Sequence, residues 1–211
     1  MSSELGGTLA CYEGRDRKLV ARRTAVLVVD AQNAELEPEV LDKHPEFAEA
    51  LKKRALPAMK RLVEGARAKG VEIIYTVIEA LTRDGRDRSL DHKLSNILVP
   101  RGSPLAKVIA DVAPTEDEIV LPKTSSGVFN STNLDYVLRN LGIENVIVAG
   151  FVTDQCVDMA IRDGADRGHY MVCAADACAA YSEERHTTAL RAFGGYCRTQ
   201  AVEEVLADIV G

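Results

Sequence analysis

Short apolar runs alternate with longer amphipathic segments along most of this chain. The apolar runs predict strands at 24–29, 71–78, 118–121, 145–149 and 169–174, and a last strand is predicted near 198–201. Apolar residues at helical spacing predict helices at 45–70, 105–112, 133–141, 184–193 and 202–209, with another starting near residue 156. Pro57 predicts a kink in the first of these helices, or its division in two.

Strands and helices alternate in this pattern, as they do in doubly wound α/β folds. We therefore expect a mainly parallel sheet of about six strands with helices on both faces. Residues 24–211 are predicted to form a single domain, and the polar residues 1–23 an N-terminal arm packed on its surface or on a neighbouring subunit. The sequence has neither GxGxxG after the first strand nor GxxxxGK[ST], the phosphate cradles of dinucleotide and P-loop sites.

The long irregular segment 80–107 interrupts the alternation. Long loops in compact domains often act as lids or binding loops. Three of its residues, Arg83, Arg88 and His92, are candidates to close over a carboxylate-bearing substrate.

Composition narrows the class of protein further. The formal net charge of −6 argues against nucleic acid or a membrane as the main partner. No apolar run reaches the length of a membrane span, and the N-terminus lacks the apolar segment of a signal peptide, so we expect a cytoplasmic protein. The five cysteines lack metal-type CxxC spacing, which argues against a disulfide framework and a structural zinc site.

Three predicted strands lead to an acid, a base and a thiol. Asp30 and Lys123 end their strands, and Cys156 follows its strand where a helix begins, a position that favours thiolate. Taken singly, these residues are also typical of a helix cap, a solvated charge and a buried thiol that fills space. The carboxyl ends of parallel strands meet at one edge of a sheet, so we expect the three side chains to converge.

A single chemistry fits the three groups together. Asp30 accepts the thiol proton, Lys123 holds the anions and lowers the thiol pKa, and Cys156 attacks a carbonyl carbon. The backbone N–H groups of Cys156 and of Gln155 or a neighbour are predicted to stabilise the oxyanion that this attack creates.

The sequence resembles the isochorismatase-like cysteine hydrolase superfamily in TAVLVVDAQN, LPKTSSGVF, GFVTDQCV and the DAC and YSEERH segments that follow. The resemblance runs from Thr24 nearly to the C-terminus and implies a catalytic triad of Asp30, Lys123 and Cys156. It also implies a non-proline cis peptide between Val152 and Thr153 that helps to aim the oxyanion donors, and assembly into a homodimer or homotetramer.

Differences within this superfamily narrow the expected activity. Isochorismatases proper lack the nucleophilic cysteine, and nicotinamidases carry an Asp and an HxH metal cluster. The histidines of this chain do not have that spacing; they are His44, His92, His169 and His186. The resemblance is thus to the amidases of small ureido and carbamoyl compounds, such as N-carbamoylsarcosine amidase, ureidoacrylate amidohydrolase and biuret hydrolase. One departure is DAQNAE after the first strand, where DMQNDF is usual.

We therefore expect a cysteine-dependent amidohydrolase that needs no cofactor or metal. It would cleave a small amide, ureido or carbamoyl compound through a covalent acyl- or carbamoyl-cysteine and release ammonia or an amine. Glu79 at another strand end is a candidate proton carrier or substrate anchor. Further candidates to line the pocket are Gln32, Asn33, Ser125, Phe129 and Tyr181.

Other functions fit parts of the same pattern. One is a catalytically silent member of the superfamily that serves as a binding or interaction subunit. A nicotinamidase is another. The third is a redox-sensing thiol protein in which Cys173 or Cys178 approaches Cys156.

Overall fold

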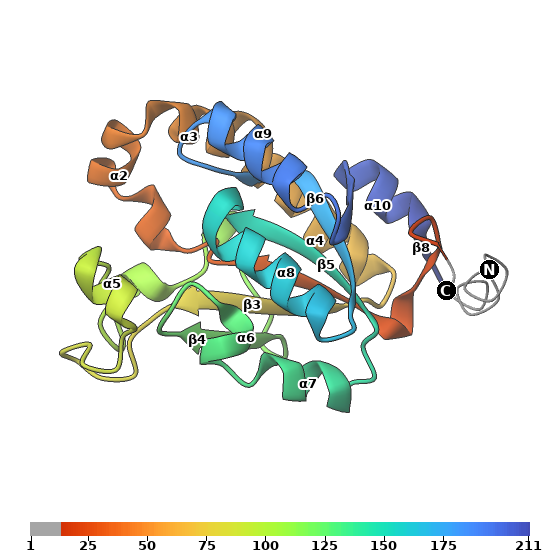
Figure 1. Ribbon diagram of the computed structural model, residues 1–211, viewed down its shortest axis with the longest axis horizontal. Helices are drawn as coiled ribbons and strands as arrows, with labels where there is room; N and C mark the ends of the chain where they lie inside the picture. Colours follow the sequence, from red (N-terminus) through yellow and green to blue (C-terminus); the bar gives the residue numbers. More distant parts are fainter. Residues whose placement is uncertain (1–13) are drawn as a thin grey trace, which may run out of the picture.

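Six parallel strands form the main sheet, in the spatial order β4-β3-β2-β5-β6-β7 (Figure 1). The computed structural model describes residues 14–211. The strands are β2 (Thr24–Val29), β3 (Glu72–Ile78), β4 (Ile119–Lys123), β5 (Asn145–Phe151), β6 (Tyr170–Ala179) and β7 (Cys197–Gln200). The prediction of a doubly wound, parallel α/β fold is therefore confirmed.

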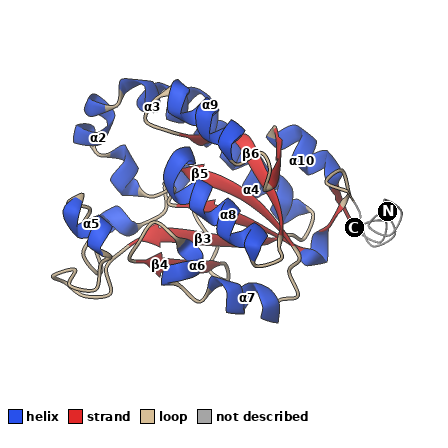
Figure 2. Ribbon diagram, in the orientation of Figure 1, coloured by secondary structure: helices blue, strands red, loops and turns tan. Residues whose placement is uncertain are grey.

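Helices cover both faces of the sheet (Figure 2). The helices on one face are α3 (Pro45–Ala50), α4 (Leu56–Ala68) and α10 (Val202–Asp208). Those on the other face are α6 (Val128–Ser131), α7 (Leu134–Asn140), α8 (Asp158–Asp166) and α9 (Glu183–Ala192). Two further helices, α2 (Pro38–Lys43) and α5 (Leu90–Leu94), lie beyond the carboxyl ends of the strands (Figure 1).

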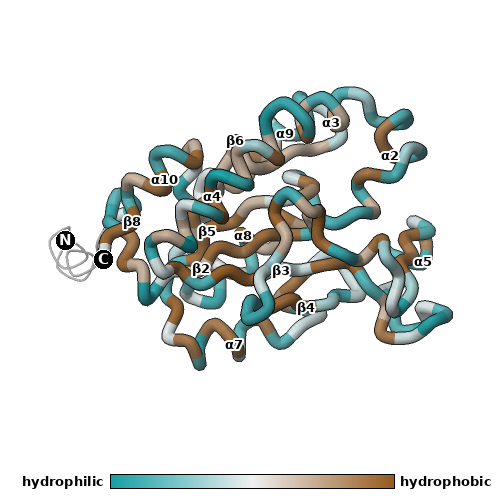
Figure 3. The backbone as a smooth tube through the Cα atoms, turned by 180° about the vertical axis from the view of Figure 1, so that it is seen from behind, coloured by the Kyte–Doolittle hydropathy of each residue, from teal (hydrophilic) through white to brown (hydrophobic). Residues whose placement is uncertain are grey.

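The central strand β2 organises both halves of the core. Every residue of β2 is buried, and successive side chains enter opposite cores: Val28 packs on the α4 side and Val29 on the α8 side. Figure 3 shows the hydrophobic colour that runs along the central strands. The strand order reverses at β2, so the switch point, where such folds bind ligands, lies at the carboxyl ends of β2 and β5.

The prediction of a helix at 105–112 is wrong. Two short 3-10 turns stand there instead, at Pro104–Ala106 and Ala110–Val112. The segment between them is extended because Val108 forms a β-bridge with Gln32, and this pairing replaces helical hydrogen bonds. The pattern also did not predict α2, α5 and α6, which have at most six residues each and are too short to show a helical period.

The long helix predicted at 45–70 consists of α3, a π-helical turn at Leu51–Ala55, and α4. Pro57 lies in the first turn of α4. The wide π-helical turn therefore stands directly before the proline, where the ring removes one backbone donor from the helix.

The described part of the predicted N-terminal arm packs along the domain. Leu19–Val20 forms β1, which pairs in parallel with β8 (Ile209–Val210) in a second, two-stranded sheet. The Arg15 guanidinium donates a hydrogen bond to Cys197 O at 3.2 Å. The rest of the arm, residues 1–13, lies outside the described residues. Between residues 14 and 211 there is no helix of the length and apolarity that crossing a membrane requires.

Gly150 permits the close approach of β5 to β2. Its φ is +133°, and a Cβ at this position would lie 2.0 Å from Val29 O. We predict that Gly150→Ala lowers the free energy of unfolding by more than about 3 kcal/mol, because the two strands must separate to admit the methyl group.

Gly142→Ala is the matched control, because Gly142 has a φ of +69° but a Cβ there would meet nothing within 4 Å. It should lose about 1–2 kcal/mol from backbone conformation alone. Urea unfolding followed by circular dichroism measures both variants. Equal losses would contradict the crowding at Gly150.

Candidate active site

Asp30 directly follows β2 and is buried. Its backbone is in the left-handed region, with φ at 52°, and its N–H donates to Thr76 O at 3.0 Å. In return, the Thr76 hydroxyl donates to Asp30 Oδ1 at 2.9 Å. The neighbouring strand β3 therefore fixes both the backbone and one carboxylate oxygen of Asp30, and Oδ2 faces Lys123.

Lys123 ends β4, and its ammonium group is fully buried. Nζ lies 2.9 Å from Asp30 Oδ2 and 3.4 Å from Cys156 Sγ. It also donates to Ser125 O at 2.9 Å and to Ser126 O at 3.3 Å. Burial opposes the charged form, but the Asp30 carboxylate and the Cys156 sulfur outweigh it, and the pKa of Lys123 is raised.

Cys156 lies in a π-helical turn, Thr153–Val157, that leads from β5 into α8. The non-proline cis peptide stands between Phe151 and Val152, so its predicted place between Val152 and Thr153 is one residue too late. The reason is that β5 continues to Phe151, beyond its predicted end, and the chain turns as soon as the strand stops. The structure thus brings Asp30, Lys123 and Cys156 together at the switch point.

Cys156 is a thiol in this site. Burial and then the negative charge of Asp30 raise the pKa of Cys156 to about 12, although Lys123 acts to lower it. Lys123 thus acts on the thiol in the expected direction, but the pKa of Cys156 is not lowered overall, because the sulfur is buried beside a carboxylate. The site provides a base instead. The Lys123 ammonium contacts both Cys156 and Asp30, and the Asp30 carboxylate can take the proton of the thiol.

The turn before Cys156 uses one predicted oxyanion donor for its own bonding. The Gln155 N–H donates to Val152 O at 3.0 Å, so the N–H groups of Cys156 and of a neighbour other than Gln155 remain the predicted donors. Thr153 does not face a substrate, because its hydroxyl lies 2.8 Å from Nδ1 of the buried His186. That contact fastens the turn to α9.

A cavity of about 650 Å³ lies beside the cluster, between α2, α5 and the turn of Cys156. Gln155, which precedes Cys156, and Ser126, whose carbonyl accepts a hydrogen bond from Lys123, both line the cavity. Tyr181 forms part of the wall and stacks on His44, with ring centroids 4.0 Å apart. Burial and the charge of Glu35 raise the pKa of Tyr181, so it stays a neutral hydrogen-bonding phenol.

Two predicted substrate-binding residues hold the scaffold together. Gln32 is buried, and its Nε2 donates to Ile78 O at 3.1 Å and to Leu105 O at 3.2 Å. Its Oε1 accepts from the N–H of Ile78 at 2.6 Å. Asn33 Nδ2 donates to Pro104 O at 3.1 Å. Both amides thus fasten the segment before residue 107, and their predicted contact with a substrate stays a prediction.

Three other candidates also lie away from the cavity wall. Glu79 Oε1 accepts from the N–H of Gly102 at 2.7 Å, so its carboxylate faces the loop instead of the cysteine. Ser125 contributes its backbone carbonyl to Lys123, while its hydroxyl points to the turn. Phe129 is buried in the core under α8 and stacks on His169, with ring centroids 6.1 Å apart. These three residues are therefore not among those that line this cavity, and their contact with a substrate stays a prediction.

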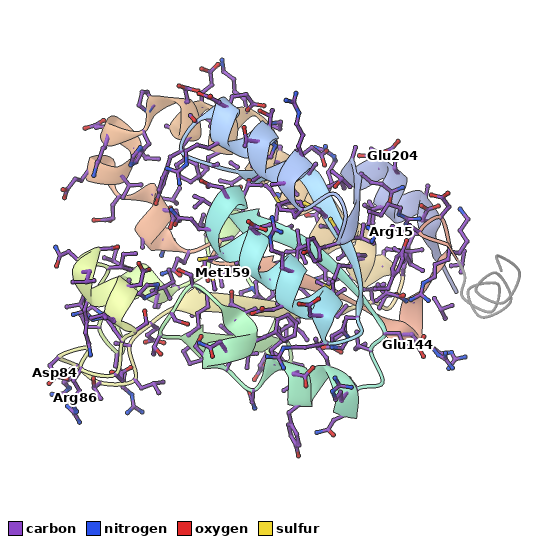
Figure 4. All side chains as sticks on the ribbon, in the orientation of Figure 1. Arg15, Asp84, Arg86, Glu144, Met159 and Glu204 are labelled. Carbon is purple, nitrogen blue, oxygen red and sulfur yellow. The ribbon has the colours of Figure 1, made fainter. Side chains whose placement is uncertain are left out.

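The 80–107 loop does not bring its arginines to the cavity. The Arg88 guanidinium donates within the loop, to Ile97 O at 2.7 Å. Arg83 lines a separate hollow together with Arg86. Figure 4 shows Arg86 at the tip of the loop, far from Met159, which lines the cavity. The loop contributes Asp91 of α5 to the cavity wall instead, together with Ser95 and Ile97, which follow this helix.

His92 is buried behind the cluster instead of lying on the loop surface. Its Nε2 lies 3.5 Å from Ser126 Oγ, beside the turn that bonds Lys123. Burial and the Lys123 charge lower the pKa of His92, so the imidazole is neutral. Within the described residues, no three His, Cys, Asp or Glu side chains are grouped so that they could hold a metal ion.

The sequence analysis missed Glu35, an acid beside the cluster. Glu35 lies in a 3-10 turn, Asn33–Leu36, and its Oε2 is buried without a hydrogen-bond partner among the described residues. Burial and then Asp30 raise the pKa of Glu35 to about 7, against the opposite effect of Lys123. The signal that points to it is the DAQNAE segment, where an acid replaces the usual aromatic residue.

A doubly wound parallel sheet with a buried acid, amine and thiol at its switch point defines an α/β protein with a candidate cysteine nucleophile. The chain belongs to the Isochorismatase domain family, whose model matches residues 24–203. The resemblance inferred from the sequence is confirmed.

Several named relatives are amidases or amidohydrolases. Ureidoacrylate amidohydrolase RutB of Azorhizobium caulinodans is 33% identical over 179 residues, which cover 75% of this chain and 77% of that protein. N-carbamoylsarcosine amidase of Arthrobacter sp is 29% identical over 171 residues, or 78% of this chain and 63% of that protein, so the chain spans less than two thirds of its length. These names agree with the expected class, a hydrolase of C–N bonds other than peptide bonds.

Solved structures of the family share the fold. The crystal structure of a cysteine hydrolase from Pseudomonas syringae pv. phaseolicola 1448A has a TM-score of 0.80 and 25% identity, and covers 94% of this chain and 97% of that one. N-carbamoylsarcosine amidase from Thermoplasma acidophilum has a TM-score of 0.70 at 22% identity, covering 86% and 97%. The second likeness concerns the fold alone.

The buried carboxylate beside the thiol leads to a prediction about cysteine reactivity. Asp30→Asn removes a negative charge next to Cys156 and leaves Lys123 to pair with the thiolate. We predict that iodoacetamide alkylates Cys156 at pH 8 at least about tenfold faster in this variant than in the natural protein, because each unit of pKa changes the thiolate fraction tenfold.

Peptide mass spectrometry measures the rate at Cys156 against time. Lys123→Gln is the control, and it should not accelerate alkylation because it removes the charge that favours thiolate. Faster alkylation in the Lys123 variant than in the Asp30 variant would contradict the assigned charges.

The buried acid Glu35 predicts a pH-dependent loss of stability. The folded chain binds a proton at Glu35 up to a pKa of about 7, whereas the unfolded chain releases it near the ordinary value of 4.5. The unfolded state therefore binds fewer protons between these values, and the contribution of Glu35 to the free energy of unfolding falls as the pH rises.

We predict that Glu35→Gln stabilises the protein at pH 8 by up to about 3 kcal/mol more than at pH 5. Urea unfolding of both proteins at the two pH values measures the difference. Curves whose separation does not change with pH would show that the Glu35 carboxylate titrates normally.

Proposed function

We propose that this protein is a cysteine-dependent amidohydrolase that cleaves a small amide, ureido or carbamoyl compound and releases ammonia or an amine. One observation carries the proposal: the Lys123 ammonium lies 2.9 Å from Asp30 Oδ2 and 3.4 Å from Cys156 Sγ, all three groups being buried beside a cavity. A base, a thiol and a charge that balances them are the parts that nucleophilic acyl transfer needs.

The first step forms a bond between Cys156 Sγ and the substrate carbonyl carbon. Asp30 takes the thiol proton as the sulfur attacks, so the high thiol pKa does not require a free thiolate in the resting site. The carbonyl oxygen becomes an oxyanion and accepts a hydrogen bond from the N–H of Cys156. The intermediate then collapses, the C–N bond breaks, and Asp30 returns the proton to the departing nitrogen.

The second step hydrolyses the acyl- or carbamoyl-cysteine. Asp30 is again a carboxylate and removes a proton from a water molecule that attacks the same carbon. The C–S bond breaks, the sulfur recovers its proton from Asp30, and the acid leaves. Lys123 remains protonated throughout and balances whichever of the two groups carries the negative charge.

The names of the relatives support this class of substrate. An N-carbamoylsarcosine amidase and a ureidoacrylate amidohydrolase both act on carbamoyl nitrogen, and both named compounds also carry a carboxylate. We propose the same reaction type for this chain. The part of the substrate that does not react would be selected by the shape and charge of the cavity.

Location and assembly stay predictions from the sequence. We propose a cytoplasmic protein that assembles into a homodimer or homotetramer and works without a metal or cofactor. Sedimentation velocity of the purified chain tests the assembly, and activity retained after dialysis against EDTA tests the absence of a metal.

Ammonia release by the purified chain tests the reaction directly. The screen covers biuret, ureidoacrylate, N-carbamoyl amino acids, simple amides and nicotinamide. We predict that Cys156→Ser lowers turnover of any accepted compound by at least about 1,000-fold while circular dichroism stays unchanged, because the covalent route is lost.

Cys197→Ser is the matched control, since Cys197 is a buried cysteine in β7 and takes no part in the mechanism. It should leave turnover within about twofold. Quenched reactions of the natural protein should also show Cys156 with the mass of a carbamoyl or acyl group. Full ammonia release by the Cys156 variant would exclude the mechanism and point to another nucleophile.

A further inference from the structure

Glu35 is a carboxylate without a partner at the edge of the catalytic cluster. Its turn connects the segment after Asp30 to α2, the helix whose Glu39, Val40 and Lys43 line the cavity. The residue as a whole is partly exposed, but its Oε2 is covered and has no hydrogen-bond donor among residues 14–211. Such a group is costly to bury unless a ligand supplies the donor.

No basic side chain within residues 14–211 forms an ion pair with Glu35. Lys123 acts on it electrostatically, but the Lys123 ammonium is already bonded to Asp30 and to the carbonyls of Ser125 and Ser126. Glu35 also raises the pKa of Tyr181, which lines the cavity, so its carboxylate acts on the same space as the wall. The Glu35 carboxylate thus interacts electrostatically both with the reacting groups and with a side chain of the cavity wall.

The cavity wall itself carries more acid than base. Asp154 and Asp158 line the cavity. Each is paired at 2.5 Å with an arginine that is not part of the cavity wall, Arg185 and Arg162 respectively. Glu39 and Asp91 add two further carboxylates, against one ammonium from Lys43. Burial lowers the pKa of His44, so this ring adds no charge near neutral pH. Because those arginines balance Asp154 and Asp158, the remaining charges of the wall are two carboxylates against one ammonium, and this excess of acid disfavours a substrate carboxylate.

We infer that Glu35 is a specificity-determining residue that selects carboxylate-free amide or ureido compounds whose remote end carries a positively charged amine. The amine would donate to Glu35 Oε2 and supply both the missing hydrogen bond and the missing charge. The inference rests on the proposed function for the reacting end of the substrate. It departs from the compounds that the relatives' names contain, because those carry a carboxylate at this end.

Three matched ureas test the inference, differing only at the remote end: N-(2-aminoethyl)urea, propylurea and 3-ureidopropanoate. Binding is measured by isothermal titration calorimetry on Cys156→Ser protein at pH 7.5, so that it does not depend on turnover. We expect the aminoethyl compound to bind at least about tenfold tighter than propylurea, and 3-ureidopropanoate to bind weakest.

Adding Glu35→Gln should bring the first two compounds to within about threefold of each other, because the neutral amide keeps the shape and loses the charge. Glu35→Asp keeps the charge and should retain part of the preference. Glu37→Gln is the matched control, since Glu37 is exposed in the same segment, and it should change nothing. Circular dichroism confirms that each variant is folded.

The outcomes separate the two proposals. A preference for the amine that survives Glu35→Gln, or tightest binding of 3-ureidopropanoate, would overturn the inference about Glu35. In the enzyme with Cys156 intact, a loss of kcat that is equal for all three ureas, with KM unchanged, would assign Glu35 to proton transfer and also overturn it. Binding in the expected order without ammonia release from any compound would uphold the inference and reject the proposed hydrolysis.

Discussion

The buried charge of Lys123 is the constraint on which the rest of the site depends. An ammonium group removed from water must be paired and hydrogen-bonded, and here a carboxylate, two carbonyls and a sulfur surround it. Because β3 separates β4 from β2, the length of the lysine side chain is what carries the charge to Asp30. The contacts of Lys123 thereby hold the strand ends of β2 and β4 and the turn of Cys156 together.

That arrangement also sets the state of the nucleophile. Burial and the Asp30 charge hold Cys156 as a thiol, and the lysine charge is shared between the carboxylate and the sulfur. A thiol beside its base is protected from unrelated electrophiles and still prepared for proton transfer. The ordering of charges therefore serves the proposed reaction better than a permanent thiolate would, because both steps use Asp30 as acceptor and donor of the same proton.

One acid does not follow this logic of paired charges. Glu35 has a covered oxygen with no donor in the part of the chain that the structure describes, and the next helix, α2, lines a cavity whose wall is acidic. Natural proteins break the rule of paired buried charges mainly at functional sites, where a ligand completes the set. The proposed amine at the remote end of the substrate would complete it here, and would explain why an acid occupies this position of the DAQNAE segment.

The sequence by itself determined the parallel sheet and the meeting of Asp30, Lys123 and Cys156, because apolar strand patterns place the residues that follow them at one edge. Only the tertiary structure decided which hydrogen-bond partners the other polar side chains find. Gln32 finds carbonyls on β3 and on a segment distant in sequence, and it clamps the two together. Burial, which no local pattern reports, decided that the thiol keeps its proton and that Glu35 stays without a partner. Both depend on which atoms of remote segments exclude water, and that is fixed only when the chain has folded.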